Sequence, residues 1–193
     1  MDGIADLYIW VNSMRDIKER SFNEWLVIES QRGKIEAFNT LLGNWEQRYF
    51  LYALNRLKSR EAARDVTQES LISISKGLHR LSDPATYPKW SFRIVERRCV
   101  DWLRKTIRER EFLQAQDELS EVPVSDGMEE KLTVEQLLSK MDSSLATTLR
   151  LYYLESLTIL EIAEVSDIPA GTVKSRLFYA RKVMAKLLEN DHE

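Results

Sequence analysis

The sequence predicts an all-α fold of two small helical domains that are joined by a flexible acidic linker. Only 6 Gly and 4 Pro occur in 193 residues, which leaves few turn signals for a many-stranded sheet. Apolar side chains recur instead at helical spacing along most of the chain. One acidic stretch without such spacing divides the chain into two units, each near the lower practical size for an independent core.

The N-terminal part is predicted to consist of an extension over residues 1–24 and a helical unit over residues 25–110. The extension carries a few apolar residues that fit a short extra helix, and the sequence assigns it no role. Within the unit, one side of a helix over residues 87–110 carries Trp90, Arg93, Arg97, Asp101, Arg104 and Arg108. The opposite side offers Phe92, Val95, Cys99 and Trp102 to a core, as helical geometry requires.

That basic stripe, with an aromatic residue at one end, is suited to a single nucleic-acid strand. Cations follow the phosphates, and rings stack on bases that have left the duplex. An ordinary amphipathic surface helix has the same pattern when its arginines pair with Asp101 and Glu109 and when Trp90 is buried. The stripe alone leaves both interpretations open.

A second helical face, upstream of the stripe, carries Asp65, Gln68, Glu69 and Ile72 at i, i+3, i+4 and i+7. Two acids and an amide around an exposed Ile suit a docking surface for a protein with basic and apolar groups. A solvated polar face has the same appearance. Paired-carboxylate catalysis is not supported, because no His, Ser or phosphate loop accompanies the acids.

The predicted linker covers residues 111–131. Between Gln114 and Glu130 it holds acids and no base, together with Pro123, Gly127 and several Ser, which is typical of a solvated connection. The acids are Asp117, Glu118, Glu121, Asp126, Glu129 and Glu130.

The C-terminal unit over residues 132–189 ends in a predicted helix-turn-helix. Thr133 with Gln136 and Thr158 with Glu161 both fit the capping box that opens helices. A short helix over residues 159–165 is followed by a turn at residues 166–168, where Asp167 tolerates a left-handed backbone. Pro169 suits the first position of the next helix, whose core side chains would be Val173, Leu177, Ala180, Met184 and Leu187. Two helices joined in this way, the second one basic, are typical of DNA readers.

The outward side of that last helix carries Lys174, Ser175, Phe178, Tyr179, Arg181 and Lys182. Lys and Arg reach guanine edges or phosphates, and aromatic rings lie against thymine methyls or sugars. Thr172 and the neighbouring amides at the helix start suit a phosphate. A solvated basic face on a helical hairpin is the alternative interpretation.

Composition excludes several other classes. Cys99 is the only cysteine, so neither a disulfide framework nor structural zinc is expected, and we interpret Cys99 as core packing and not as a redox sensor. His79 and His192 stand alone. We expect no cofactor, no metal, no catalytic residue, no signal peptide and no membrane span, which predicts a cytoplasmic protein. The net charge of −3 hides a segregation of acids and bases that matters more than the total.

Taken in order, these motifs resemble the extracytoplasmic-function sigma factors of bacterial RNA polymerase. Residues 62–71 (AARDVTQESL) resemble the stretch that binds the clamp helices of the polymerase β′ subunit. Residues 90–94 (WSFRI) and 101–105 (DWLRK) resemble the reader of the −10 promoter element. Residues 160–164 (LEIAE) and 168–177 (IPAGTVKSRL), with Ala180-Arg181 behind them, resemble the reader of the −35 element.

The resemblance implies a role for each surface, with domain 2 of a sigma factor over residues 25–110 and domain 4 over residues 132–189. Core polymerase, through β′ and β, would be bound by Asp65, Gln68, Glu69 and Ile72. Single-stranded −10 DNA would be bound by Tyr87, Trp90, Arg93, Arg97, Arg104 and Lys105, with the loop over residues 82–86 helping Tyr87 and Trp90 to hold a flipped base. Double-stranded −35 DNA would be bound by Thr172, Lys174, Ser175, Arg176, Phe178, Tyr179 and Arg181.

The resemblance also implies an anti-sigma partner that releases the protein on stress, and no cofactor. Some positions depart from the family pattern: Ser75 stands where Trp is common, Arg97 where Asn is common, and Leu81 and Tyr87 where Phe is frequent. Asp167 takes a usual Gly position. These departures bear on the −10 sequence preference.

Two other functions stay open at this point. A stand-alone helix-turn-helix regulator would bind duplex DNA as a dimer without polymerase. An adaptor that mimics a sigma factor would sequester an anti-sigma protein and never bind DNA. Substituting Arg176 and Arg181 separates these, because promoter output should collapse only for a protein that reads DNA.

Overall fold

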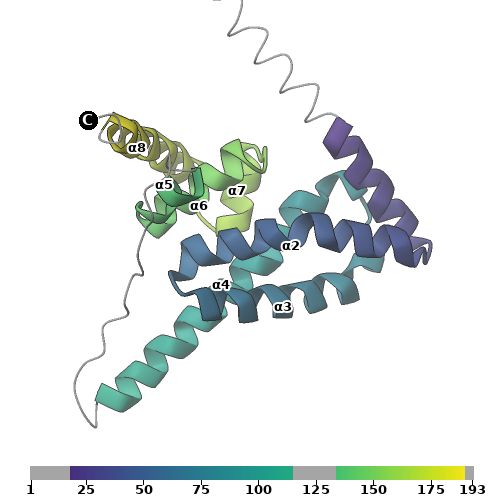
Figure 1. Cartoon of the computed structure of the whole chain (residues 1–193), viewed down its shortest axis with the longest axis horizontal. Coiled ribbons are helices and arrows are strands. Elements are labelled where there is room, and N and C mark those ends of the chain that lie inside the picture. The colour runs from purple at the N-terminus through teal and green to yellow at the C-terminus, as the bar shows by residue number, and fades with distance from the viewer. Residues whose placement is uncertain (1–17, 115–133, 190–193) are drawn as a thin grey trace, which may run out of the picture.

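The structure, a computed structural model, describes residues 18–114 and 134–189, and these are helices joined by short turns (Figure 1). The prediction of an all-α fold is confirmed over these ranges. In the N-terminal unit, a helix whose described part covers residues 18–31 is followed by α2 (Ile35–Leu57), α3 (Arg60–Gly77), the 3₁₀ turns η1 (Leu78–Arg80) and η2 (Pro84–Thr86), and α4 (Tyr87–Gln114).

Local signals explain where these helices begin and end. Gly33 has a φ of 87° between the first helix and α2, a conformation that glycine adopts without steric cost. Lys58 ends α2 in the left-handed region, and the side chain of Ser59 then caps α3 by accepting a hydrogen bond from the amide of Ala62. Asp83 caps η2 in the same way through the amide of Ala85. Short polar side chains at such positions satisfy amides that have no partner inside the helix.

An aromatic cluster forms the centre of the N-terminal unit. Phe92 on α4 lies 6.0, 5.4 and 5.3 Å, centroid to centroid, from Trp45, Tyr49 and Tyr52 on α2. All four side chains are buried. The edge-to-face contacts that dominate the cluster are the favoured geometry for aromatic pairs, so the cluster fixes α4 against α2.

The C-terminal unit consists of α5 (Val134–Ser139), α6 (Ser143–Tyr153), α7 (Ile159–Ser166) and α8 (Ala170–Glu189). The predicted capping box of Thr158 and Glu161 is present, and Asp167 has the predicted left-handed backbone, with φ 53° and ψ 48°. Pro169 was predicted to be the first residue of the last helix, but α8 begins one residue later, at Ala170. Pro169 precedes the helix, and its carbonyl accepts a hydrogen bond from the amide of Thr172. The box predicted at Thr133 falls outside the described residues.

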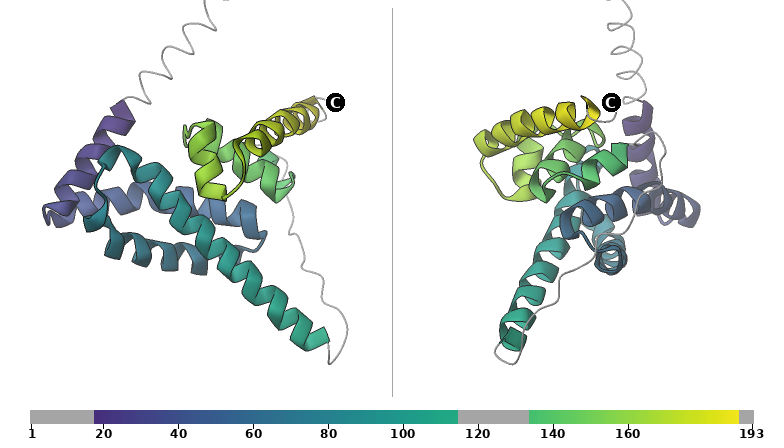
Figure 2. Two further views of the ribbon diagram at one scale, coloured as in Figure 1. Left: turned by 180° about the vertical axis from the view of Figure 1, so that it is seen from behind. Right: turned by 60° about the vertical axis from the view of Figure 1, so that its left-hand side comes forward.

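The two units pack directly against each other. Helix α6 lies against α2, and α7 lies against α4, an arrangement that Figure 2 shows from two further sides. One buried cluster includes Tyr49 and Phe92 from the N-terminal unit together with Leu157, Ile162 and Leu177 from the C-terminal one. The far end of α4 projects away from this body (Figures 1 and 2).

Three predicted boundaries meet continuous helices or undescribed residues. The described part of the first helix begins before residue 25, so the last residues of the predicted extension belong to the same helix as the start of the predicted unit. Helix α4 continues past residue 110 to Gln114. The six acids of the predicted linker lie outside the described residues. No helix within the described ranges is long and apolar enough to cross a membrane.

Candidate nucleic-acid interface

The outward face of α8 carries the predicted side chains in an exposed group. Lys174, Ser175, Phe178, Tyr179 and Arg181 are all exposed. Helix α8 presents them because Val173, Leu177 and Ala180 occupy its buried side. The face therefore combines cations and aromatic rings at one surface, which is the chemistry that major-groove readers use.

Two contacts hold the basic side chains of this face in place. The guanidinium of Arg181 donates from Nε to the hydroxyl of Tyr153 on α6 at 2.9 Å. The ammonium of Lys182 lies 4.6 Å from the ring centroid of Phe178. Tyr153 was not found by sequence reasoning, because no local pattern connects it to a residue on α8.

Thr172 and Arg176 lie apart from that group. Both are only partly exposed, although Ser175 donates to the carbonyl of Thr172 at 2.9 Å within the first turn of α8. The charge of Arg176 lowers the pKa of Asp142 and opposes the rise that burial causes in the pKa of Glu96 on α4. Arg176 is therefore near the inner side of the C-terminal unit, where α4 packs.

The predicted stripe on α4 is present as a surface. Arg93, Arg97, Arg104 and Lys105 are exposed, and the side chains of Phe92, Val95 and Cys99 on the opposite side are buried. Lys105, next to this stripe, is 3.8 Å from Glu109, an exposed i,i+4 pair of small energetic value. The cations of the stripe are accordingly free to meet phosphates.

The two aromatic residues at the start of α4 have different surroundings. Trp90 is partly exposed and packs at the edge of the core. Tyr87 is fully buried, and its hydroxyl accepts a hydrogen bond from Tyr49 at 3.1 Å. Burial raises the pKa of Tyr87 well above the ordinary value. Only Trp90 of this pair reaches the surface in this conformation.

The predicted docking face on α3 is also exposed. Asp65, Gln68, Glu69 and Ile72 are all solvent-accessible, with Ile72 53% exposed. Arg98 on α4 stands beside this face: it lies 3.8 Å from Glu69 and donates to Ser73 at 2.8 Å. Sequence reasoning did not select Arg98, because it falls between the core side of α4 and the basic stripe.

The remaining candidates for chemistry are Cys99 and groups of possible metal ligands. Cys99 is buried, and burial raises the pKa of its thiol, which makes the thiolate inaccessible. Across residues 18–114 and 134–189, no three His, Cys, Asp or Glu side chains gather in a way that could hold a metal ion. His192 lies outside the described residues.

Two family models match the chain, and they fall on the two units. The model described as Sigma-70 region 2 matches residues 43–109, and the model described as Sigma-70, region 4 matches residues 131–184. Together they cover more than half of the 193 residues. The chain therefore belongs to the sigma-70 family.

Within that family the chain is an extracytoplasmic-function (ECF) sigma factor. It is 26% identical to the RNA polymerase sigma-H factor of Pseudomonas aeruginosa, over 86% of this chain and 94% of that protein. It is also 26% identical to the ECF RNA polymerase sigma-E factor of Haemophilus influenzae, over 89% of this chain and 97% of that one. These alignments confirm the resemblance that the motifs predicted.

Solved structures share the fold. The sigma factor RpoE of Bartonella quintana, crystallised with the anti-sigma factor NepR, superposes with a TM-score of 0.63 at 18% identity, over 80% of this chain and 98% of that one. CnrH, solved in complex with the cytosolic domain of CnrY, superposes with a TM-score of 0.58 at 20% identity, over 88% of this chain and 99% of that one.

Proposed function

We propose that this sigma factor binds core RNA polymerase through the exposed face of α3 and directs it to promoters through α8 and α4. The observation that carries the proposal is the separation of three exposed surfaces on three helices. An acidic and apolar face lies on α3, a basic stripe on α4 and a basic, aromatic face on α8. One surface suits a protein partner and the other two suit nucleic acid.

At the −35 element, α8 would enter the major groove of duplex DNA. Lys174, Ser175, Phe178, Tyr179 and Arg181 are the side chains that can reach base edges and phosphates from its outward face. Before DNA binds, the guanidinium of Arg181 is already positioned by its hydrogen bond to Tyr153. Arg181 therefore loses less side-chain conformational freedom on binding. Thr172 and Arg176 are predicted to contact DNA as well, but both are only partly exposed. They would reach DNA only after α8 moves away from the elements packed beside it.

At the −10 element, the stripe of α4 would bind a strand that has left the duplex. Arg93, Arg97, Arg104 and Lys105 would follow the phosphates, and Trp90 offers a ring for a base that is extruded at a cost of a few kcal/mol. Tyr87, the predicted partner of Trp90, would have to leave its buried place to touch the same base. Its present role is to support the ring of Trp90, 6.0 Å away between centroids.

Binding of both elements together would depend on core polymerase. Because both readers are on one chain, the first contact raises the effective concentration of the second. The net charge of −3 keeps the free protein a weak DNA binder, since the overall charge repels phosphate at a distance. The subunit would act in the cytoplasm with polymerase and would carry no catalytic group of its own.

We also propose that an anti-sigma protein silences this subunit until stress releases it. The support is the likeness to RpoE and CnrH, whose structures were solved with NepR and with the cytosolic domain of CnrY.

The test is competition for core polymerase against the housekeeping sigma factor. Reversing the charge of Asp65 and Glu69 to Arg should weaken competition strongly, because like charges then meet at the docking surface. The matched control reverses Glu36 and Glu46, two exposed acids on α2, and should compete as the unmodified protein does. Absence of competition by the well-folded unmodified protein would contradict the proposed function and favour a stand-alone regulator.

A further inference from the structure

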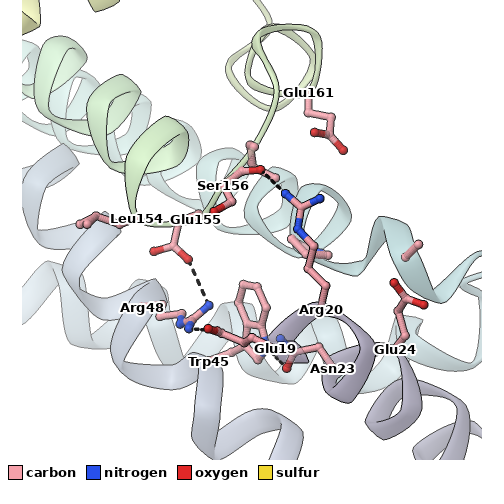
Figure 3. Close-up of a pocket in the computed structure, with 13 residues that line it drawn as sticks. Glu19, Arg20, Asn23, Glu24, Trp45, Arg48, Leu154, Glu155, Ser156 and Glu161 are labelled. Atoms are coloured by element: carbon pink, nitrogen blue, oxygen red, sulfur yellow. Dashed lines mark hydrogen bonds and ion pairs between the residues drawn. The ribbon is translucent and has the colours of Figure 1, made fainter. Parts of the chain in front are cut away.

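The first described turns of the helix over residues 18–31 touch both units of the molecule at once. Glu19 forms an ion pair with Arg48 on α2, and the side chain of Asn23 accepts a hydrogen bond from the indole of Trp45 at 3.1 Å. Arg20, between them, donates to the carbonyl of Ser156 at 2.6 Å. Ser156 belongs to the turn between α6 and α7, so this helix bridges to the C-terminal unit (Figure 3).

The same place holds a charged network that crosses the junction. Arg48 lies 3.5 Å from Glu155, and its guanidinium stands 4.8 Å from the ring centroid of Trp45. Glu155 lies 3.8 Å from Arg150, which also pairs with Glu135 on α5. Figure 3 shows Arg48 between Glu19 and Glu155, beside a cavity of about 130 Å³.

Two members of this network are buried charges. The side chains of Arg150 and Glu155 are each only 2% exposed. Arg150 donates from Nε to Asn55 on α2 at 3.1 Å, a further direct contact between the units. A buried charge is tolerated only beside its partners, so the network fixes how the two units meet while they are packed together.

Further contacts hold the two units in this packed arrangement, which we call closed. Lys89 at the start of α4 lies 2.9 Å from Glu164 on α7. The ammonium of Lys58, at the end of α2, donates to the carbonyls of Ser139 and Met141 at 2.9 Å each. The junction is therefore held by polar contacts at several places besides the shared apolar core.

This closed arrangement cannot serve both promoter elements. Positions −35 and −10 are separated by about 25 base pairs, which is roughly 85 Å of duplex at 3.4 Å per base pair. Helix α8 has 20 residues and is roughly 30 Å long at 1.5 Å per residue, and it is packed in one body with α4 through α7. Reading both elements on one promoter requires the units to separate.

We propose that the segment over residues 19–23 is a latch that holds the free sigma factor closed, through Arg48 and the turn at residues 155–156. Opening this latch is then a step that core polymerase must drive before both promoter elements are read. The inference rests on the proposed function for its consequence, whereas the latch itself rests only on the contacts above. It gives a role to the end of the extension whose sequence suggested none.

The latch is tested by measuring the distance between the two units in the free, full-length protein. Spin labels on Asn39→Cys in α2 and Lys186→Cys in α8 occupy exposed positions, in a Cys99→Ala background. At about pH 5.5, where the Glu155 carboxyl is protonated in the closed form, the unmodified latch should give one narrow distance distribution. Glu19→Ala with Arg20→Ala should add a broad population at longer distance, because the contact of Arg20 across the junction is lost and Arg48 loses the carboxylate that holds it beside Glu155.

The matched control removes the same pair of charges from positions without a contact to the C-terminal unit, Lys18→Ala with Glu36→Ala. It should keep the narrow distribution. The latch variant should also bind a pre-melted promoter that carries both elements more tightly than the unmodified protein, roughly tenfold where the open form is a minor species. Its affinity for a duplex with the −35 element alone should change much less, since the outward face of α8 is already exposed and only Thr172 and Arg176 depend on opening.

Identical distance distributions for the latch variant and the unmodified protein would overturn the latch, even where both compete for core polymerase. A latch variant that opens while neither protein binds core polymerase would overturn the proposed function and leave the latch standing. The two proposals therefore fail in different measurements.

Discussion

Trp90 shows how one residue at the proposed −10 surface is positioned by its neighbours. A Cβ added at Gly77, the last residue of α3, would lie 2.9 Å from Cζ2 of the Trp90 indole and 3.4 Å from Cη2. Real Cβ atoms do not come so close to a ring carbon. Gly77 therefore makes room for the indole, and the absence of a side chain at residue 77 sets where Trp90 can lie.

We predict that Gly77→Ala displaces Trp90 and destabilises the fold by about 1–3 kcal/mol, the usual effect of overpacking. Open-complex formation should fall, while binding to a −35 duplex should stay unchanged. Denaturant unfolding and permanganate footprinting of melted bases measure the two effects.

Gly43→Ala is the control for this prediction. Gly43 lies inside α2 with no atom within 4 Å of an added Cβ, so alanine should stabilise the helix by about 0.5–1 kcal/mol. Equal effects of the two substitutions would contradict the role given to Gly77.

For single residues, the exposure of a side chain was harder to predict than the kind of ligand it suits. Tyr87 and Trp90 are both aromatic and three positions apart, so the sequence treats them alike. The structure separates them because the hydroxyl of Tyr87 finds a partner in Tyr49, 38 positions earlier. A hydrogen bond of that range leaves no pattern in either segment.

At the scale of elements, the pair α7 and α8 was the most predictable part of the chain. Its signals are local: the Thr158–Glu161 box starts α7, Asp167 ends it, and apolar residues recur at helical spacing along α8. The start of α8 was displaced by one residue, since Pro169 precedes the helix and its carbonyl accepts the first hydrogen bond. Assignments of helix ends commonly differ by that much.

The outward face of α8 leads to a prediction about two charges on one helix. Arg181→Ala should weaken binding to a −35 duplex by about 1–3 kcal/mol and should reduce the salt dependence by about one phosphate contact. Lys186→Ala removes the same charge from an exposed position of α8 beyond the proposed reading face, and its effect should be much smaller. Fluorescence anisotropy over a range of salt concentrations measures both.

Tyr153→Phe extends this prediction to the residue that holds Arg181. It removes the acceptor of the 2.9 Å hydrogen bond without a change in charge, so affinity should fall while the salt dependence stays the same. Equal losses for Arg181→Ala and Lys186→Ala would mean that α8 attracts DNA by charge alone.

At the scale of the whole molecule, the two helical units could be predicted from the sequence, but the way they pack against each other could not. Arg150 stands in α6 among apolar, hydroxyl and tyrosine side chains, where nothing marks it as the centre of a buried network. Its partner Asn55 is 95 positions away, and Arg20 reaches a carbonyl 136 positions away. Contacts of this kind depend on how two surfaces meet, which helical periodicity does not encode.

The buried network makes the closed arrangement sensitive to pH. Burial raises the pKa of Glu155 from an ordinary 4.5 to about 7, against the opposing effect of nearby cations. The groups that face it are Arg48 on α2 and Arg150 on α6, which lower its pKa, and Glu19 on the first helix and Glu135 on α5, which raise it. In an open molecule the carboxyl is solvated and returns toward its ordinary value.

The sign follows from the protons bound in each state. Between pH 4.5 and about 7 the closed form holds a proton on Glu155 that the open form has lost, so raising the pH favours opening. Closure is strongest below this window and weakest above pH 7, where the difference levels off at up to about 3 kcal/mol. Protonated Glu155 therefore favours the closed sigma factor.

We predict that the Asn39→Cys and Lys186→Cys spin-labelled protein gains open population between pH 5.5 and pH 8. Glu155→Gln should remain closed over this range, because glutamine resembles the protonated acid and carries no charge to bury. Glu46→Gln, at an exposed position of α2, should follow the unmodified protein. If Glu155→Gln opened with pH as the unmodified protein does, the titration would belong to another group, and the network would hold the units together without sensing protons.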